Sequence, residues 1–243
     1  MPKTLPKTAA APSNRRTQAE RTQHTQKKII DGAIQLLKKK GYASFRTAEV
    51  AELAGVSKGA QTHHFPAKDM LVLQALEEVF RNTQNRALAR VDAALAAPAR
   101  MLQLLVADSN EFFLGDDFLM SLDLMMVDPD SALGADVKRL AQQYRLPVEQ
   151  AWLDALLEAG HPAPQARDVV RLTFALGRGF GIRQVIAGPD PEYQRLLATW
   201  MRMAEAMLLL SAPTAATLST ALPPIAKPEA KTKTKPKPKR RPS

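Results

Sequence analysis

The segment that most constrains the fold is residues 46–71, RTAEVAELAGVSKGAQTHHFPAKDML. Apolar residues at helical spacing after Thr47 predict a short helix with Thr47 as its N-cap, since a threonine hydroxyl accepts a bond from a free backbone N–H. Gly55 follows at a position where helices commonly end. Ser57 is a second N-cap, and Pro66 ends the next helix because the residue before a proline is disfavoured in the α region. Two short helices joined by a glycine-containing turn predict a helix–turn–helix whose second helix enters the major groove of DNA.

Two runs of this segment, GVSKGA at residues 55–60 and HFPAKDML at residues 64–71, resemble the DNA-binding domain of the tetracycline-repressor (TetR) family. The resemblance covers about residues 22–72, including an amphipathic helix before the motif and the start of a long helix after it. One departure is that Gln61 and Thr62 stand where these repressors commonly have a bulky apolar residue and a phosphate-contacting Tyr. The resemblance implies an all-α transcriptional regulator, with the helix–turn–helix domain followed by a helical ligand-binding and dimerisation domain.

Charge is distributed unevenly along the 243 residues, whose formal net charge is +10. Residues 28–68 carry seven Lys or Arg against three Asp or Glu, whereas residues 69–226 carry thirteen against nineteen. The two ends are basic, with net charges of +5 in residues 1–27 and +7 in residues 227–243. A basic DNA-contacting part joined to an acidic body is expected of a regulator rather than of a general polyanion binder.

Several classes of protein are excluded by what the sequence lacks. It contains no Cys, which excludes disulfides and Cys-based metal sites and fits a cytoplasmic protein. No apolar run approaches the roughly 18 residues of a membrane span, and no secretory signal begins the chain. His63 and His64 are adjacent, so on a helix they point about 100° apart and cannot chelate one metal from one face. Without a nucleophile–base motif or a phosphate-cradling loop, neither an enzyme nor a cofactor is expected.

Apolar periodicity predicts nine helices and no strand. Besides the short helix after Thr47, they are expected at residues 22–40, 58–65, 67–97, 99–114, 116–127, 132–159, 165–187 and 191–210. The domains are expected to be a disordered basic arm (1–21), the helix–turn–helix domain (22–66), the ligand-binding and dimerisation domain (67–210) and a disordered Lys/Pro-rich tail (211–243). The two basic ends are either solubilising tails or loose, sequence-independent contacts to DNA.

The second helix of the motif supplies the residues expected to read bases. Lys58 can donate to guanine O6 and N7, Gln61 can pair with adenine, and Ala60 can meet a thymine methyl. The alternative for Gln61 is that it faces the core. The resemblance implies that Thr47, His64 and Lys68 contact phosphates, with Lys68 beside the exposed N–H groups at the start of the long helix. The full predicted set is Thr47, Ser57, Lys58, Gly59, Ala60, Gln61, Thr62, His63, His64 and Lys68.

Gly177, Gly179 and Gly181 fall within five residues of one expected helix. Each glycine costs a helix roughly 1 kcal/mol, so this spacing predicts that another helix approaches closely. The resemblance implies a homodimer formed by the last two helices, which places two recognition helices about 34 Å apart on a palindromic operator. The predicted interface consists of Phe174, Gly177, Gly181, Trp200, Met203 and Met207. The alternative is that these helices are ordinary monomer core.

The middle helices are rich in Phe and Met, and Met often lines adaptable binding surfaces. The resemblance implies a small-molecule effector between these helices, although the same stripe is also typical of core. The predicted ligand-binding residues are Phe113, Met120, Leu124, Met125, Trp152, Phe174 and Arg178. Arg178 is either a counter-charge for a polar ligand group or an interface ion pair.

These observations predict a repressor released from a palindromic operator by a small apolar effector. Two rival functions stay open. One is a helical carrier or enzyme with a vestigial DNA-binding domain, and the other is a sequence-independent DNA binder that acts through its basic tails.

Overall fold

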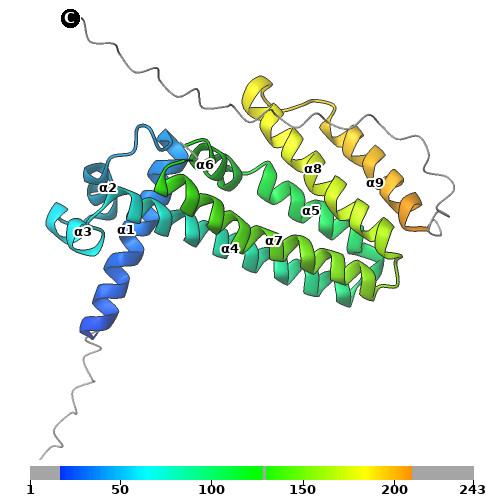
Figure 1. The fold of residues 1–243 in the computed structure, drawn as a ribbon, viewed down its shortest axis with the longest axis horizontal. Helices are drawn as coiled ribbons and strands as arrows, with labels where there is room; N and C mark the ends of the chain where they lie inside the picture. Colours follow the sequence, from blue (N-terminus) through cyan, green and yellow to red (C-terminus); the bar gives the residue numbers. More distant parts are fainter. Residues whose placement is uncertain (1–16, 128–129, 210–243) are drawn as a thin grey trace, which may run out of the picture. The chain divides into compact units, whose positions relative to one another are not determined.

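The computed structural model describes residues 17–127 and 130–209, and the regular structure in these ranges is entirely helical (Figure 1). The expected all-α class and the number of α-helices are confirmed for these ranges, which also hold one short 3₁₀ helix. The elements are α1 (Gln18–Lys40), α2 (Thr47–Ala54), α3 (Lys58–His64), α4 (Lys68–Ala96), η1 (Pro98–Arg100), α5 (Met101–Phe113), α6 (Asp116–Met125), α7 (Ala132–Glu158), α8 (Ala163–Ala187) and α9 (Tyr193–Leu209). The predicted arm before residue 17 and the predicted tail from residue 211 lie outside the described residues.

Helix α1 begins earlier than the sequence pattern indicated. The Thr17 side chain accepts a bond from the Glu20 backbone N–H at 3.2 Å, and the Glu20 carboxylate accepts one from the Thr17 N–H at 2.7 Å. This reciprocal capping box satisfies two backbone donors that the first turn would otherwise leave free. The assignment of residues 18–21 to a disordered arm is therefore wrong, because they form the first turn of α1.

The turn between α2 and α3 depends on local backbone chemistry. Gly55 has φ 62° and ψ 40°, a left-handed conformation that glycine adopts without steric cost. The Ser57 hydroxyl accepts a bond from the Ala60 N–H at 3.1 Å, which confirms Ser57 as the N-cap of α3. Thr47 was wrongly expected to cap α2. Arg46 precedes that helix and Thr47 is its first residue, with no side-chain cap.

The DNA-binding part and the body share contacts through three helices. Helix α1 packs against α2, α4 and α6, while α4 continues along α7 and α5 (Figure 1). Helix α5 then packs against α8, and α8 against α9. The described residues fall in one compact unit, and the largest fully buried side chains in it include Phe45, Phe80, Trp152 and Phe174. A displacement of α4 or α6 would therefore alter the contacts that these helices make with α1.

Two prolines lie where the sequence suggested interruptions. Pro98 begins the 3₁₀ helix that leads into α5, and Pro147 lies inside α7. None of the helices in the described ranges has the length and apolarity needed to cross a bilayer.

Candidate nucleic-acid interface and ligand cavity

The outer face of α3 consists of small and polar residues. Lys58, Gly59, Thr62 and His63 are exposed, while Ala60 and His64 are half-buried. Within the described part of the chain, no carboxylate forms an ion pair with Lys58, so its charge is available to a partner. This face therefore offers one cation, one hydroxyl and one imidazole, with no bulky side chain to prevent close approach.

Gln61 does not belong to that face. Its side chain is 2% exposed, and its amide Nε2 donates to the Phe65 carbonyl at 3.1 Å. The prediction that Gln61 pairs with adenine is wrong in this structure, and the alternative that it faces the core holds. The physical reason is that the amide satisfies a carbonyl just past the C-terminus of α3, where intrahelical donors have run out.

Lys68 and Arg46 form a small basic group beside the motif. The Lys68 ammonium donates to the Tyr42 carbonyl at 3.1 Å and lies 3.9 Å from the centroid of the Tyr42 ring. Burial, together with the nearby Arg46 charge, lowers the pKa of Lys68. Arg46 is exposed and donates to the carbonyls of Ala43 and Phe45 at 3.0 Å. The sequence pattern did not single out Arg46, because nothing local distinguishes it from other surface arginines.

A cavity of about 620 Å³ lies in the body, with walls from α4 to α8. Three of the predicted ligand-binding residues, Phe113, Met125 and Arg178, line it. The full lining is Phe80, Phe112, Phe113, Phe118, Met125, Asp130, Gly134, Lys138, Ala141, Gln142, Arg145, Leu146, Glu149 and Arg178. The cavity thus combines a cluster of aromatic rings with several charged side chains.

The other four predicted ligand-binding residues do not line this cavity. Met120, Leu124, Trp152 and Phe174 are each at most 3% exposed and pack in the core. The Trp152 indole N–H is already bonded to the buried Asp108 carboxylate at 3.0 Å. Apolar periodicity marks inward-facing positions without showing which of them border a cavity.

Aromatic side chains form one wall of the cavity. The rings of Phe112, Phe113 and Phe118 contact one another edge to face, with centroids 5.1 to 5.9 Å apart. The Arg145 guanidinium lies 3.7 Å from the centroid of Phe112, and the Arg178 guanidinium lies 5.2 Å from that of Phe113. Nothing in the sequence distinguishes Arg145 from the other charged residues of the long helix α7.

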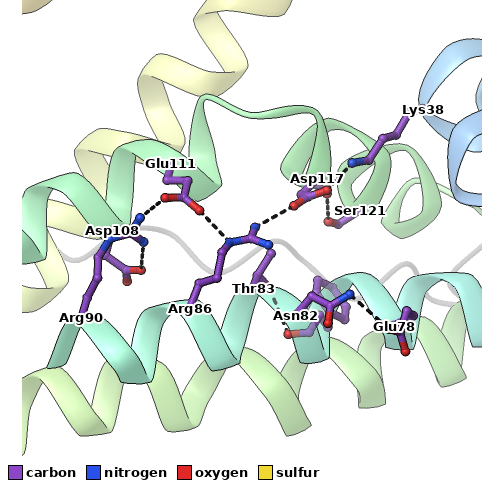
Figure 2. A network of polar contacts seen from close by, with 11 residues as sticks. Lys38, Glu78, Asn82, Thr83, Arg86, Arg90, Asp108, Glu111, Asp117 and Ser121 are labelled. Carbon is purple, nitrogen blue, oxygen red and sulfur yellow. Dashed lines mark hydrogen bonds and ion pairs between the residues drawn. The ribbon is translucent and has the colours of Figure 1, made fainter. Parts of the chain in front are cut away.

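A chain of ion pairs links the neighbourhood of the cavity to the DNA-binding part (Figure 2). Lys38 of α1 bonds Asp117 of α6 at 2.5 Å, and Asp117 also accepts from Arg86 of α4 at 3.1 Å. Arg86 in turn contacts Glu111 of α5 at 2.6 Å. Four helices therefore meet in one polar network, and only Lys38 comes from the helix–turn–helix domain.

The network ends at a buried carboxylate close to the cavity. Glu111 also pairs with Arg90, whose guanidinium bonds Asp108 at 3.2 Å (Figure 2). Burial raises the pKa of Asp108, while the Trp152 hydrogen bond and the charges of Arg145 and Arg90 oppose that rise. Asp108 thus joins the network to two cavity neighbours, Phe112 and Arg145, which adjoin it in a small pocket.

The glycines of α8 make room for α5 of the same chain. A Cβ on Gly181 would lie 2.1 Å from the Phe113 carbonyl oxygen, and one on Gly177 would lie 2.3 Å from the Ser109 Oγ. Nothing lies within 4 Å of the corresponding position on Gly179. The predicted close approach is confirmed for two of the three glycines, but the approaching helix is intramolecular.

The residues predicted for the dimer interface differ in their exposure. Phe174, Gly177, Gly181 and Trp200 are buried within the subunit, whereas Met203 is 55% exposed and Met207 is half-buried. Other apolar side chains of α8 and α9 do reach the surface: Leu172, Leu176, Ile182, Val185, Ile186 and Leu196. A second cavity of about 380 Å³ lies under this surface, lined largely by α8, α9 and α5.

Comparison with known proteins agrees with this arrangement. A family model described as "Bacterial regulatory proteins, tetR family" matches residues 29–75. The chain is similar to the HTH-type transcriptional regulator CymR of Pseudomonas putida, with 39% identity over 191 residues that cover 78% of this chain and 94% of CymR.

Two solved structures show the same fold. One is a TetR-family protein from Mesorhizobium loti, with a TM-score of 0.62, 17% identity and coverage of 77% of this chain and 95% of that one. The other is the multidrug binding protein EbrR complexed with malachite green, with a TM-score of 0.51, 21% identity and coverage of 76% and 98%. Taken with the helix–turn–helix and the CymR match over nearly the whole of that protein, these findings show that the chain belongs to the tetR family and is a DNA-binding transcriptional regulator.

Proposed function

We propose that the protein is a homodimeric repressor that binds a palindromic operator and is released from it by a small, mainly apolar effector. The observation that carries the proposal is the position of α4 and α6. Both helices contribute side chains to the 620 Å³ cavity, and both pack against α1 of the DNA-binding part. A ligand that moves either helix therefore acts on the helix that supports the helix–turn–helix.

DNA contact is assigned to the exposed face of α3 and the cations around it. Lys58, Thr62 and His63 would face base edges and phosphates in the major groove, and Arg46 and Lys68 would face the phosphate backbone. Gln61 supports α3 from inside. Of the other predicted contacts, Thr47 lies half-buried in the first turn of α2, where free backbone N–H groups favour a phosphate.

Dimerisation is assigned to the apolar surface of α8 and α9. Leu172, Leu176 and Met203 are 43%, 38% and 55% exposed and border the 380 Å³ cavity. Exposed apolar side chains that cluster on one surface commonly mark an interface with another protein. A two-fold pairing of these helices would bury them and leave the two α3 helices free to read two half-sites.

Release requires that the effector bind the DNA-incompetent state more tightly, since only a difference in affinity shifts a population. The 620 Å³ volume and aromatic wall of the cavity suit a small molecule with apolar surface. EbrR, a protein of the same fold, has been solved with malachite green. The ion-pair network from Asp108 to Lys38 offers a physical connection between cavity and α1.

The proposal is tested by binding the full chain to DNA from upstream of its own gene and to a scrambled sequence of equal length and composition. A salt series separates phosphate contacts, which weaken steeply with salt, from base reading. We expect a preference of at least about 1000-fold for the natural sequence, as is usual for specific binding. Equal binding to both DNAs, lost when residues 212–243 are removed, would instead indicate a sequence-independent binder.

Lys58→Ala should weaken operator binding roughly 30-fold. Each subunit would lose one charged contact worth about 1 kcal/mol or more, and the loss enters twice in a dimer. Titration of labelled operator by fluorescence anisotropy measures the change. Arg139→Ala is the matched control, since Arg139 is an exposed cation on α7 whose ion pair is with Asp136. An equal loss in both variants would show that general charge, rather than α3, determines the affinity.

Lys38→Met should weaken the communication between cavity and DNA. The variant keeps the apolar stem but removes the bond to Asp117, so the ratio of operator affinities without and with a cavity ligand should fall about fivefold. Stability should change by less than about 1 kcal/mol, as is usual for partly exposed pairs. Lys39→Met is the control, because Lys39 is an exposed neighbour on α1. An unchanged ratio in Lys38→Met would remove the network from the mechanism.

A further inference from the structure

Arg145 is a cation in the cavity wall whose guanidinium makes no hydrogen bond or ion pair with any residue that the structure describes. It is partly buried, and its guanidinium lies over the Phe112 ring. In the ranges 17–127 and 130–209, no hydrogen bond or ion pair reaches its nitrogen atoms. The nearby carboxylate of Asp108 is instead bonded by Arg90 and Trp152. The charges of Asp108 and Glu149 stabilise Arg145 without bonding it, and a partly buried guanidinium whose N–H donors are unbonded gains from an acceptor that supplies the missing hydrogen bonds.

The Arg145 guanidinium carbon lies 3.7 Å from the Phe112 ring centroid, a distance typical of stacking. A guanidinium that stacks on a ring uses its flat face, whereas its five N–H donors lie in the plane and point away from the ring. Burial lowers the pKa of Arg145 to about 10, so the group stays protonated at neutral pH. A planar fork of donors matches a carboxylate, which can accept two parallel hydrogen bonds.

The other charges in the cavity favour an anion by a small margin. Arg178 and Lys138 line the same cavity as Arg145, and the carboxylates in its wall are Glu149 and Asp130. Asp108, outside the cavity wall, and Glu149 are close enough to stabilise the charge of Arg145, but neither forms an ion pair with it within the described residues. Three cations against two carboxylates leave the wall positive, with the aromatic rings of Phe113 and Phe118 beside it.

We propose that the effector is an organic anion, with a carboxylate held by Arg145 and an aromatic or branched apolar body packed against Phe113 and Phe118. Arg178 would add a second positive charge near the body. The proposal relies on the proposed function for its regulatory consequence, but binding of the anion to the cavity can be measured without DNA. The proposed effector is therefore an amphiphile with one negatively charged end, a more specific class than a mainly apolar molecule.

The first experiment compares three aryl probes that differ in one group: 2-naphthoate, 2-naphthamide and 2-naphthylmethylamine. Isothermal calorimetry with the full chain, without DNA, measures the dissociation constants. We expect the carboxylate to bind at least about tenfold more tightly than the amide, since a hydrogen-bonded charge pair adds roughly 1.5–3 kcal/mol. The amine should bind most weakly. Benzoate and biphenyl-4-carboxylate, each with its own amide, repeat the comparison at a smaller and a larger size.

Variants at two positions assign the preference to Arg145. Arg145→Met retains the volume of the stem and should weaken carboxylate binding roughly 10- to 100-fold while leaving amide binding within about twofold. Arg145→Lys should restore part of the carboxylate affinity. Arg139→Met, on the exposed side of the same helix, should change neither. A merely structural role of Arg145 would instead lower the affinity for carboxylate and amide equally.

Glu149→Gln is expected to strengthen carboxylate binding two- to fivefold, because it removes a negative charge that competes for Arg145. Tighter binding of the amine than of the carboxylate would overturn the proposal and point to Glu149 as the recognition group. Carboxylates that bind no better than their amides at all three sizes, up to about 1 mM, would also overturn it. Release of operator DNA is assayed separately. Carboxylate binding without release would refute the repressor mechanism while leaving the anion site intact.

Discussion

Leu176→Arg is expected to convert the protein into a monomer and to lower its operator affinity by roughly 1000-fold or more. Leu176 lies on the apolar surface of α8, and a two-fold interface there would bury two unpaired guanidinium groups at once. A monomer carries one α3, so it loses the second half-site and the effective concentration that comes with it. Sedimentation velocity at several concentrations would measure the association state, and anisotropy titration the operator affinity.

Leu88→Arg provides a matched control for this variant. Leu88, on α4, is 37% exposed against 38% for Leu176, so the two substitutions place the same charge at equal exposure. The control should remain a dimer with unchanged operator affinity. Should Leu176→Arg also remain a dimer, the surface of α8 and α9 would not be the interface, and the apolar residues there would need another partner.

Gly181→Ala is expected to lower the free energy of unfolding by about 2 kcal/mol. The added Cβ would fall 2.1 Å from the Phe113 carbonyl oxygen, a backbone atom that can move only if α5 moves with it. Overpacking of this kind usually costs 1–3 kcal/mol, and the gain in helix propensity offsets about 1 kcal/mol at most. Urea denaturation followed by circular dichroism would give the value.

Gly179→Ala should have the opposite sign. Its Cβ position is empty to 4 Å, so replacing a helical glycine there should raise the free energy of unfolding by roughly 0.5–1 kcal/mol. For two glycines only two residues apart on one helix, we therefore predict changes of opposite sign. If both substitutions changed the free energy of unfolding equally, α5 would not pack closely on α8 at Gly181. The position of Phe113 in the cavity wall would then also be incorrect.

The helix–turn–helix could be derived from the sequence because its signals are local. Gly55 adopts a left-handed conformation, Ser57 caps α3, and the residue before Pro66 leaves the helix, and each effect acts over a few residues. The nine α-helices of the described residues follow for the same reason, since apolar spacing reports which face of a helix is buried. The first turn of α1 carries no apolar stripe, so only the capping box of Thr17 and Glu20 marks where this helix begins.

The tertiary structure alone decided what each buried or exposed residue touches. The spacing of Gly181 with the neighbouring glycines predicted that a helix approaches closely. Only the fold identified that helix as α5 of the same chain. Gln61 had two opposite orientations open to it, and packing against the end of α3 chose one. Arg145 is a candidate ligand contact because of two tertiary contacts. Its guanidinium lies over Phe112 of α5, and the Asp108 carboxylate is bonded by Arg90 and Trp152 instead. Such pairings join residues far apart in the chain, and the sequence determines which faces are buried but not which faces meet.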